Sequence, residues 1–378
     1  MTVTAPATTQ NGHTVLRATD LPPGVSGKPY VMSSQDGEII YIPLSKSATR
    51  LLVTGKETDN AFAVIGSSGS QSDPIGFHYH AKAHDVFLCL KGNVNVWEND
   101  EARTMDPGDF ASVPPGTIHQ YQILGDHSEM VGLIVPGGWE EFFRFIGEPY
   151  DGPLWPLDDQ RNVFEVLIPR LKAAAEQFDM IPLPQNKQFG PSPWKETENK
   201  LPGKLEPYFL KNATGPAYLA GGSVVRPLIT TAESDGKFVI GSIEGSKQHA
   251  ENDLFSAGRQ LKFSETHHAF QIVEGAVQFH IGSALPTLLH SGEIVYVPRG
   301  TTFSYHFRTR FAKMYSFASG PGVVELLIKS GHTYSAPVPP EKASSLDHQQ
   351  LQNSAKECAG EICNEAISAT FNHMSQCM

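Results

Sequence analysis

Four side chains in the first third of the chain have the types and spacing of a metal site: His78, His80, Asp85 and His119. Residues two apart in a β-strand point to the same face, so a strand through this segment would direct His78 and His80 into one interior. Imidazole nitrogens and a carboxylate oxygen suit a divalent transition metal that keeps one or two coordination positions open. The pattern therefore predicts one mononuclear metal centre with room for a substrate or dioxygen.

His84 and Cys89 lie close to Asp85 in the sequence and are alternative candidates for metal ligands. His84 comes directly before Asp85 and would point away from it in an extended strand, but a local bulge would exchange the two, and we favour Asp85. Cys89 shares the side of Asp85 in a regular strand, yet a thiol there is more often a small buried hydrophobe, and we leave it out of the site. A single His-x-His pair is also more often structural than ligating, so the prediction depends on all four residues together.

The four residues lie in phrases that recur in the second half of the chain. In the first half, Asp85 is followed seven residues later by Gly92 and then by the run Gly108–Gly116, which reads glycine, acid, a short strand, Pro-x-Gly. In the second half, His268 is followed seven residues later by Gly275 and then by the run Gly292–Gly300, which has the same pattern. The offset between the two sets is about 183 residues. Matching phrases at a near-constant offset predict a duplicated β-barrel.

The second copy has lost the ligand types. The offset places Leu261, Phe263 and Phe303 at its three histidine positions and leaves His268 alone at the carboxylate position. One imidazole cannot hold a catalytic metal against water. We therefore expect one metal per chain, in the N-terminal barrel, and a C-terminal barrel that serves as a scaffold.

The elements that must position these residues are short strands. The chain has 34 Gly and 28 Pro, and its β-branched and aromatic segments between about Glu38 and Val135 are separated by turn residues, which is typical of all-β barrels. Apolar residues recur at helix spacing between Val163 and Phe178. The predicted organisation is a flexible arm (1–25), a metal-binding barrel (26–148), a connector with helix (149–215), a degenerate barrel (216–335) and a polar tail with a helix (336–378).

The composition of the chain indicates which classes of partner and which cellular location to expect. A net charge of -11 disfavours binding to nucleic acid and to anionic membrane surfaces. The first residues lack the basic and apolar regions of a secretory signal, and no stretch approaches the roughly 18 apolar residues of a membrane span, so a cytoplasmic location is expected. The four cysteines are too few for a disulfide framework in 378 residues and are expected to be reduced: Cys89, Cys358, Cys363 and Cys377.

The two phrases of the first half resemble the two cupin motifs. They read His78-x-His80-x4-Asp85-x6-Gly92 and Gly108-x5-Pro114-x-Gly116-x2-His119, with Asp85 where glutamate is usual. Beyond the motifs, the chain is similar to the fungal quercetinases, the flavonol-cleaving bicupin dioxygenases, in phrases such as Val135-Pro136-Gly137-Gly138-Trp139 and Ala269–Gly275. The likeness covers most of the chain, and the degenerate second barrel fits this family better than oxalate decarboxylase-like bicupins with ligands in both halves.

The resemblance implies an all-β bicupin with two tandem jelly-roll barrels, and a set of site residues. The metal ligands would be His78, His80, Asp85 and His119, and Asp85 would also be the base that takes the enolic proton of the substrate, with one methylene less reach than glutamate. An apolar pocket for a flat aromatic substrate would be formed by Ile65, Ser67, Phe87, Tyr121, Met130, Ile134 and Trp139.

The leading hypothesis is a metal-dependent, ring-cleaving dioxygenase that acts on a flavonol-like or other phenolic or enolic aromatic compound. Its metal would be iron or copper, with manganese, nickel and cobalt as alternatives, and its partners a small aromatic substrate and dioxygen. A homodimer remains an option. The alternatives are a metal-dependent tailoring enzyme, an isomerase or a decarboxylase on an aromatic polyketide-like compound, and a small-molecule-binding cupin without catalysis.

Overall fold

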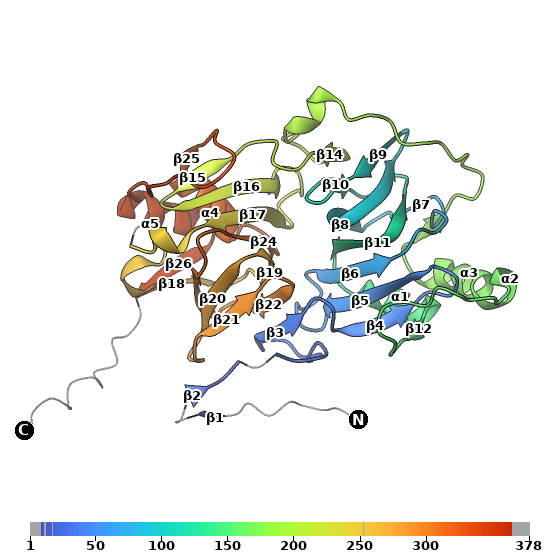
Figure 1. Ribbon diagram of the computed structural model, residues 1–378, viewed down its shortest axis with the longest axis horizontal. Helices are drawn as coiled ribbons and strands as arrows, with labels where there is room; N and C mark the ends of the chain where they lie inside the picture. The colour runs from blue at the N-terminus through green and yellow to red at the C-terminus, as the bar shows by residue number, and fades with distance from the viewer. Residues whose placement is uncertain (1–8, 11–12, 17, 252, 365–378) are drawn as a thin grey trace, which may run out of the picture.

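The computed structural model describes residues 9–10, 13–16, 18–251 and 253–364 of the chain. Two β-barrels lie side by side, the N-terminal one in blue and green and the C-terminal one in yellow and red (Figure 1). The prediction of two tandem barrels with a helical connector and a C-terminal helix is confirmed. Much of the arm predicted over residues 1–25 lies outside the described residues, as does Cys377; β1 (Thr9–Gln10) and β2 (His13–Thr14) pair with each other.

The N-terminal barrel is built from antiparallel strands. These are β4 (Glu38–Tyr41), β5 (Ser47–Val53), β6 (Ala63–Gly69), β7 (His78–Tyr79), β8 (His84–Glu98), β9 (Glu101–Met105), β10 (Phe110–Val113) and β11 (His119–Val135). Strand β8 continues without interruption through Gly92. This residue has a φ of +65°, and an added Cβ would meet the Ser128 hydroxyl at 2.1 Å. Only glycine therefore fits this bend in a continuous strand.

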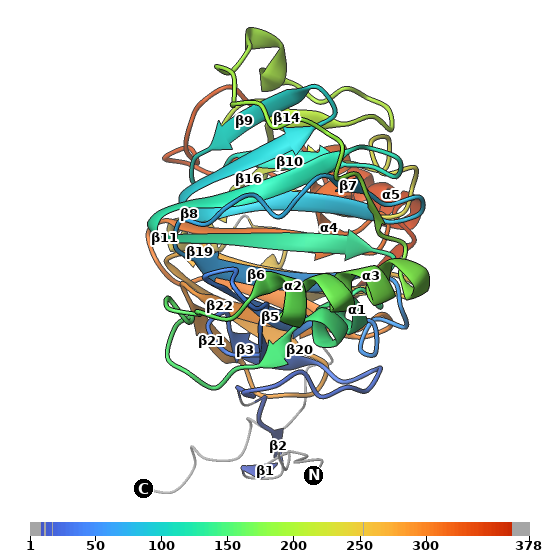
Figure 2. The same ribbon diagram turned by 90° about the vertical axis from the view of Figure 1, so that its right-hand side faces the viewer.

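Helices follow the barrel in the connector. The elements are α1 (Glu140–Ile146), β12 (Glu148–Pro149), α2 (Val163–Val166), α3 (Ile168–Gln177), β13 (Ile181–Pro182), a 3-10 helix (Glu196–Asn199) and β14 (Tyr208–Leu210). The Asn162 side chain caps α2 by accepting the Phe164 N–H. Pro169 is the second residue of α3, in the first turn, where its missing N–H removes no hydrogen bond within the helix. Figure 2 shows α1, α2 and α3 together at one side of the barrel.

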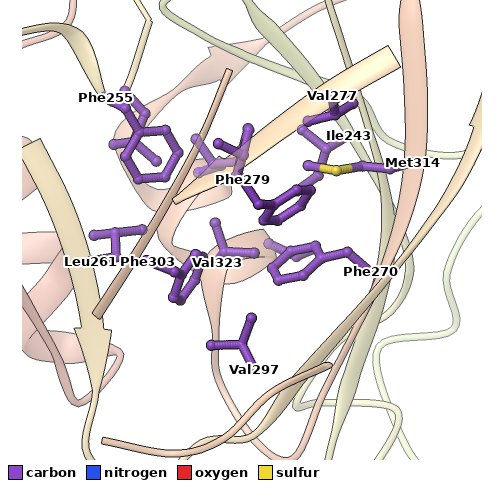
Figure 3. Close-up of a cluster of buried hydrophobic side chains, with 14 of the residues drawn as sticks. Ile243, Phe255, Leu261, Phe270, Val277, Phe279, Val297, Phe303, Met314 and Val323 are labelled. Atoms are coloured by element: carbon purple, nitrogen blue, oxygen red, sulfur yellow. The ribbon is translucent and has the colours of Figure 1, made fainter. Parts of the chain in front are cut away.

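The C-terminal barrel repeats this order of elements. Its strands and helices are β15 (Tyr218–Ala220), β16 (Ser223–Ile229), β17 (Val239–Gly245), β18 (Arg259–Phe263), β19 (His268–Glu274), β20 (Ala276–Ile281), β21 (Thr287–His290), β22 (Glu293–Val297), β23 (Thr302–Phe307), β24 (Ala312–Ala318), α4 (Val323–Ser330), β25 (His332–Thr333), α5 (His348–Glu357) and β26 (Gly360–Asn364). Its interior is closely filled by aromatic and aliphatic side chains, among them Phe270, Phe279 and Phe303 (Figure 3).

The two halves exchange strands. Strand β3 (Tyr30–Ser33) lies within the range expected for the first barrel but pairs with β22 of the second, and β14 pairs with β10 of the first. The Tyr30 hydroxyl donates to the Leu52 carbonyl at 2.7 Å, and the Tyr208 hydroxyl donates to the Leu228 carbonyl at 2.5 Å. Each exchanged strand thus gives its backbone to one barrel and its tyrosine to the other.

The outer faces of the two barrels form a shared core. Val86, Leu88 and Leu133 from β8 and β11 pack in one cluster with Ile294 and Phe317 from the second barrel. Side chains alternate along β8, so Val86 and Leu88 point outward while Asp85 and Phe87 point into the first barrel. No helix among the described residues is long and apolar enough to cross a membrane.

Candidate metal centre

Three strands bring the four predicted ligand residues into one region. Strand β7 pairs with β11 at His78 and His119, and β11 pairs with β8, which carries Asp85. His78 and His80 face the barrel interior, and Phe77 on the other side of the chain packs against Trp97, with ring centroids 6.5 Å apart. The alternation expected from the His-x-His spacing is therefore present.

Gly116 places His119 beside β7. Its φ is +84°, a backbone conformation that glycine adopts without steric cost, and its N–H donates to the His80 carbonyl at 2.7 Å. The Pro-x-Gly turn of the second motif therefore connects directly to the strand that carries the first motif.

All three rings are held in the same tautomer. A backbone carbonyl lies near each Nδ1: Gly76 at 2.9 Å from His78, Asp179 at 2.5 Å from His80, and Thr117 at 3.0 Å from His119. A carbonyl oxygen can only accept, so each Nδ1 carries a hydrogen, and Nε2 is the nitrogen that offers a lone pair when the ring is neutral. The potential ligand atoms of the three histidines lie within 4.8 Å of one another. The structure thus contains a three-histidine site of the kind that binds a divalent metal.

Asp85 adds a carboxylate to this site. Its Oδ2 lies 3.2 Å from His80 Nε2 and 3.6 Å from His119 Nε2. Ligand atoms that are each about 2 Å from one ion lie about 3 Å apart, so this spacing fits a shared cation. His119 Nε2 is buried without a hydrogen-bond partner among the described residues, as is Asp85 Oδ1. The donor set therefore fits a divalent transition metal bound through the three Nε2 atoms and Oδ2.

Burial and neighbouring charges shift the pKa values of the site residues in different directions. Burial, followed by the neighbouring His119 and His80 rings, lowers the pKa of His78 well below its ordinary value, so this ring is neutral at pH 7. Burial alone would lower the pKa of His80 and raise the pKa of Asp85, but their mutual attraction outweighs it. The pKa of His80 is raised, and the pKa of Asp85 lies well below its usual range. Asp85 is therefore ionised and can pair with a cation.

His84 is turned away from the centre. Its Nε2 lies 2.9 Å from the Ser112 hydroxyl, its ring packs edge-on against Phe238 of the second half at 4.8 Å, and burial lowers its pKa to about 4. Asp85, rather than His84, is the residue that the structure brings to the histidines. Cys89 is buried, and its thiol donates to the carbonyls of Lys91 and Gly92.

Strand register places the candidate pocket residues of β6, β8 and β11 inside the first barrel. Ile134 lies opposite Asp85 across the β8–β11 pair, so Ile134 and, four residues earlier, Met130 share the face of Asp85. Ile65 and Ser67 on β6 lie opposite Gly132 and Met130 of β11 and so share this face as well.

Aromatic rings complete the surroundings of the histidines. The Trp139 indole meets the His80 ring edge-on, with centroids 4.3 Å apart. Phe87 lies 6.2 Å from the His119 ring and 5.7 Å from Tyr121. Burial, with a smaller contribution from the Asp85 charge, raises the pKa of Tyr121 to about 12, so its hydroxyl keeps its proton. All seven candidate pocket residues therefore line the barrel that holds the histidines.

Asp179 contacts the site although it lies outside both cupin motifs. This residue follows α3 in the connector, where no local motif marks it, yet its carbonyl accepts the His80 Nδ1–H. Its carboxylate also accepts hydrogen bonds from the backbone N–H groups of Ala81, Lys82 and Ala83. Only the folding of the connector onto the barrel reveals this contact.

The second barrel offers no comparable set. His268 Nε2 accepts the Val323 N–H at 3.3 Å, and its ring stacks on Phe270 with centroids 5.7 Å apart. Leu261 and Phe303, at two of the former ligand positions, lie in the apolar core (Figure 3). Among the described residues, no group of three His, Cys, Asp or Glu side chains other than the three histidines of the first barrel is close enough to hold a metal ion.

The chain is similar to one family model and to several known proteins. Residues 69–136, which include all four candidate ligands, match the family model described as a Cupin domain. The chain is 28% identical to quercetin 2,3-dioxygenase from Aspergillus japonicus over 313 residues, which cover 76% of this chain and 88% of that protein. It is 35% identical to quercetin 2,3-dioxygenase from Bacillus subtilis over 155 residues, which cover 41% of this chain and 45% of that one. A solved structure of Bacillus subtilis oxalate decarboxylase aligns with a TM-score of 0.48 and 14% identity over 78% of each chain.

Proposed function

Since the chain is a quercetinase-like cupin of two tandem barrels, we propose that it is a metal-dependent dioxygenase that cleaves a ring of a flavonol-like or other phenolic or enolic aromatic substrate. The observation that carries the proposal is the convergence of three Nε2 lone pairs and one carboxylate oxygen inside an aromatic-lined barrel. When bound, the metal would polarise a substrate oxygen and bring the substrate together with dioxygen. We propose iron or copper, with manganese, nickel and cobalt as alternatives.

The three histidines would hold the metal. Their Nδ1–H bonds to backbone carbonyls fix the orientation of each ring, so little conformational freedom is left to lose on metal binding. The three supporting carbonyls come from the loop before β7, the turn before β11 and the connector.

Asp85 would both bind the metal and accept a proton. Its Oδ2 faces two of the Nε2 atoms, whereas its Oδ1 is buried without a hydrogen-bond partner among the described residues. A free carboxylate oxygen at this point can accept the enolic proton of a substrate placed in the barrel. The two oxygens of one side chain would thus divide the two roles.

The aromatic and sulfur-containing side chains would position the substrate. Phe87, Trp139 and Met130 offer ring faces and a polarisable thioether against which a planar ring system can stack. Tyr121 keeps its hydroxyl proton and can donate it in a hydrogen bond to a substrate oxygen.

The test is oxygen uptake by metal-analysed protein. Purified protein, loaded with each of the five metals in turn, is incubated with a flavonol in air and under anaerobic conditions. We expect oxygen consumption that matches the loss of flavonol absorbance in air, and no loss without oxygen. His78→Ala protein is the control.

Two outcomes would contradict the dioxygenase proposal. Conversion of the substrate that proceeds equally without oxygen would indicate an isomerase or a decarboxylase. Flavonol binding without turnover, and with the same affinity after the metal is removed, would indicate a small-molecule-binding cupin.

A further inference from the structure

We propose that Asp179, in the connector, is a positioning residue of the metal centre: it holds His80 and the loop between His80 and Asp85 in ligating geometry. This inference rests on the metal centre of the proposed function and extends it to a part of the chain that lies outside both cupin motifs. It concerns metal binding alone and is independent of the substrate.

The Asp179 side chain gathers the loop that separates two candidate ligands. Its carboxylate oxygens accept the backbone N–H groups of Ala81 at 2.9 Å, Lys82 at 2.6 Å and Ala83 at 3.2 Å. Hydrogen bonds to an ionised acceptor are about twice as strong as neutral ones. Three of them from successive residues fix the path of the chain between His80 and Asp85.

The Asp179 backbone acts on His80 directly. Its carbonyl accepts the His80 Nδ1–H at 2.5 Å, which fixes the tautomer and the rotation of the ring. The carboxylate controls the position of this carbonyl, because both belong to one residue that is held to the loop by three hydrogen bonds. Loss of the carboxylate would therefore free both the loop and the ring orientation.

The chain after Asp179 continues the support along β7. Ile181 of β13 pairs with Tyr79, and the Leu183 N–H donates to the Phe77 carbonyl at 2.8 Å. Strand β7 consists of only His78 and Tyr79. It pairs with β13 on one side and with β11, at His119, on the other. Met180 is buried in the same cluster as Trp139, whose ring contacts His80. The connector is thus part of the wall of the site.

The second half of the chain provides an internal comparison. Strand β26 pairs with β18 as β13 pairs with β7, and β26 lies beside β18 in Figure 1. Glu361 pairs with Lys262, the counterpart of Tyr79, so Ala359 occupies the position equivalent to Asp179. The loop from Phe263 to His268 has the same length as that from His80 to Asp85.

The comparison separates the fold from the metal site. The half without a ligand set forms this loop and strand pair with alanine at the equivalent position, which offers no carboxylate. That loop is held by other contacts: the Thr266 hydroxyl donates to the Pro321 carbonyl, and the His267 N–H donates to the Ser319 hydroxyl. A carboxylate is therefore not the only means of holding a loop of this length. The half with the candidate ligands has a carboxylate at this position. It accepts hydrogen bonds from the loop between His80 and Asp85.

Cobalt(II) binding tests the role of Asp179. Affinity is measured by competition with a chelator, geometry by the visible spectrum of the bound ion, and stability by the unfolding midpoint of the metal-free protein. We expect Asp179→Ala to weaken cobalt binding by about 10- to 100-fold and to change the spectrum. Asp179→Asn, which keeps one acceptor oxygen, is expected to fall between Asp179→Ala and the wild type. The metal-free midpoint of Asp179→Ala is expected to fall, because three charge-assisted hydrogen bonds are lost, so affinity and spectrum are compared at a temperature at which all variants are folded.

Glu176→Ala is the matched control. Glu176 is an exposed acid on α3, three residues before Asp179, so the variant removes the same charge from the same segment. It is expected to bind cobalt as the wild type does. Wild-type affinity and spectrum in Asp179→Ala would overturn the proposal. If that variant fails to fold, wild-type affinity in Asp179→Asn would overturn it.

The test also separates this inference from the proposed function. A wild-type protein that binds cobalt but leaves flavonols intact would contradict the proposed function alone, and the cobalt affinities would still decide the role of Asp179. A wild-type protein that binds no cobalt would overturn both.

Discussion

Asp85 stands where the cupin motif usually has glutamate, and its side chain is one methylene shorter. The structure shows how it still reaches the histidines, because β8 begins immediately before it and Oδ2 comes within 3.2 Å of His80 Nε2. The shorter side chain leaves Oδ1 buried and without a partner among the described residues. If Asp85 has the two proposed roles, the substitution affects the position of the proton acceptor more than the binding of the metal.

Replacement of Asp85 by Asn should separate the two proposed roles. Asparagine keeps the size and one ligating oxygen but cannot act as a carboxylate base. We expect metal binding to weaken and turnover to fall further, by about 10²- to 10⁴-fold at saturating metal. Asp85→Glu should be milder if the reaction is flavonol cleavage. Full activity of the Asn variant at saturating metal would remove the base role.

Loss of a single imidazole should abolish activity without loss of the fold. His80→Ala and His119→Ala each remove one of the three proposed nitrogen ligands from a site where both rings are at most 4% exposed. The barrel core includes neither ring, so circular dichroism spectra should match that of the wild type. Metal content and turnover are the measurements, and a variant that retains both would show that the centre lies elsewhere.

At the scale of elements, the connector is bound to the N-terminal barrel by a buried ion pair. Arg103 of β9 is fully buried and donates to Glu198 of the 3-10 helix through Nε at 3.0 Å and Nη2 at 2.5 Å. Its Nη2 also donates to Glu101 at 2.7 Å. The contact holds the later part of the connector on the first barrel, close to β14, whose residues Tyr208 and Leu210 pack in the shared core.

Arg103→Ala should therefore be strongly destabilising. The variant leaves the Glu198 carboxylate, only 9% exposed, without its partner, and breaking a buried ion pair typically costs about 3–5 kcal/mol. Chemical denaturation measures the free energy of unfolding. Lys204→Ala is the control, because it breaks the exposed Lys204–Glu206 pair and should change stability by less than about 1 kcal/mol. Equal effects of the two variants would contradict this account.

At the scale of the whole molecule, the duplication extends beyond the barrels. In each half a helix and a short strand follow the barrel, α1 with β12 and α4 with β25. A second helix and a second strand come later in each half, α3 with β13 and α5 with β26. Strand β13 pairs with β7 and β26 pairs with β18, which are the strands that carry the first motif or its counterpart. The connector and the C-terminal segment are thus equivalent parts of one repeat. The chain is two similar units that exchange β3 and β14, with the ligands kept in one of them.

One metal per chain follows from this asymmetry. Elemental analysis of the purified wild type should give one equivalent of a transition metal, and His78→Ala should reduce it to near zero. Two equivalents in the wild type, one of which survives the loss of His78, would show that the second barrel also binds metal.

The metal-free barrel should make stability depend on pH. Burial, followed by the His267 charge, lowers the pKa of His268 from its ordinary value of 6.5 to about 3. Between these values the unfolded chain binds a proton at His268 and the folded chain does not, so the free energy of unfolding falls as the pH falls. The contribution of this residue should be about 2 kcal/mol lower at pH 5 than at pH 8.

His268→Gln tests this contribution. Glutamine keeps a polar atom near the Val323 N–H but does not titrate. Its unfolding free energy, measured by denaturation at both pH values, should fall by about 2 kcal/mol less than that of the wild type. Parallel curves for the two proteins would contradict the lowered pKa of His268.

The sequence by itself determined the features that depend on local spacing and on repetition. Alternation along a strand is a property of the backbone, so His-x-His predicted that His78 and His80 share a face. The recurring glycine phrases predicted two barrels, and the offset predicted that Leu261, Phe263 and Phe303 occupy the positions of the ligands. Each of these inferences compares residues that are near in sequence or aligned by the repeat.

Only the tertiary structure decided the features that join distant segments. The tautomers of the rings depend on which carbonyls lie beside them, and one of these, Asp179, is 99 residues from His80. His84 faces Ser112 and Phe238, which are also remote in sequence. The exchange of β3 and β14 has no local signature, because a short apolar strand pairs equally well with either sheet until packing selects one. Long-range packing is the physical step that a pattern in the sequence does not encode locally.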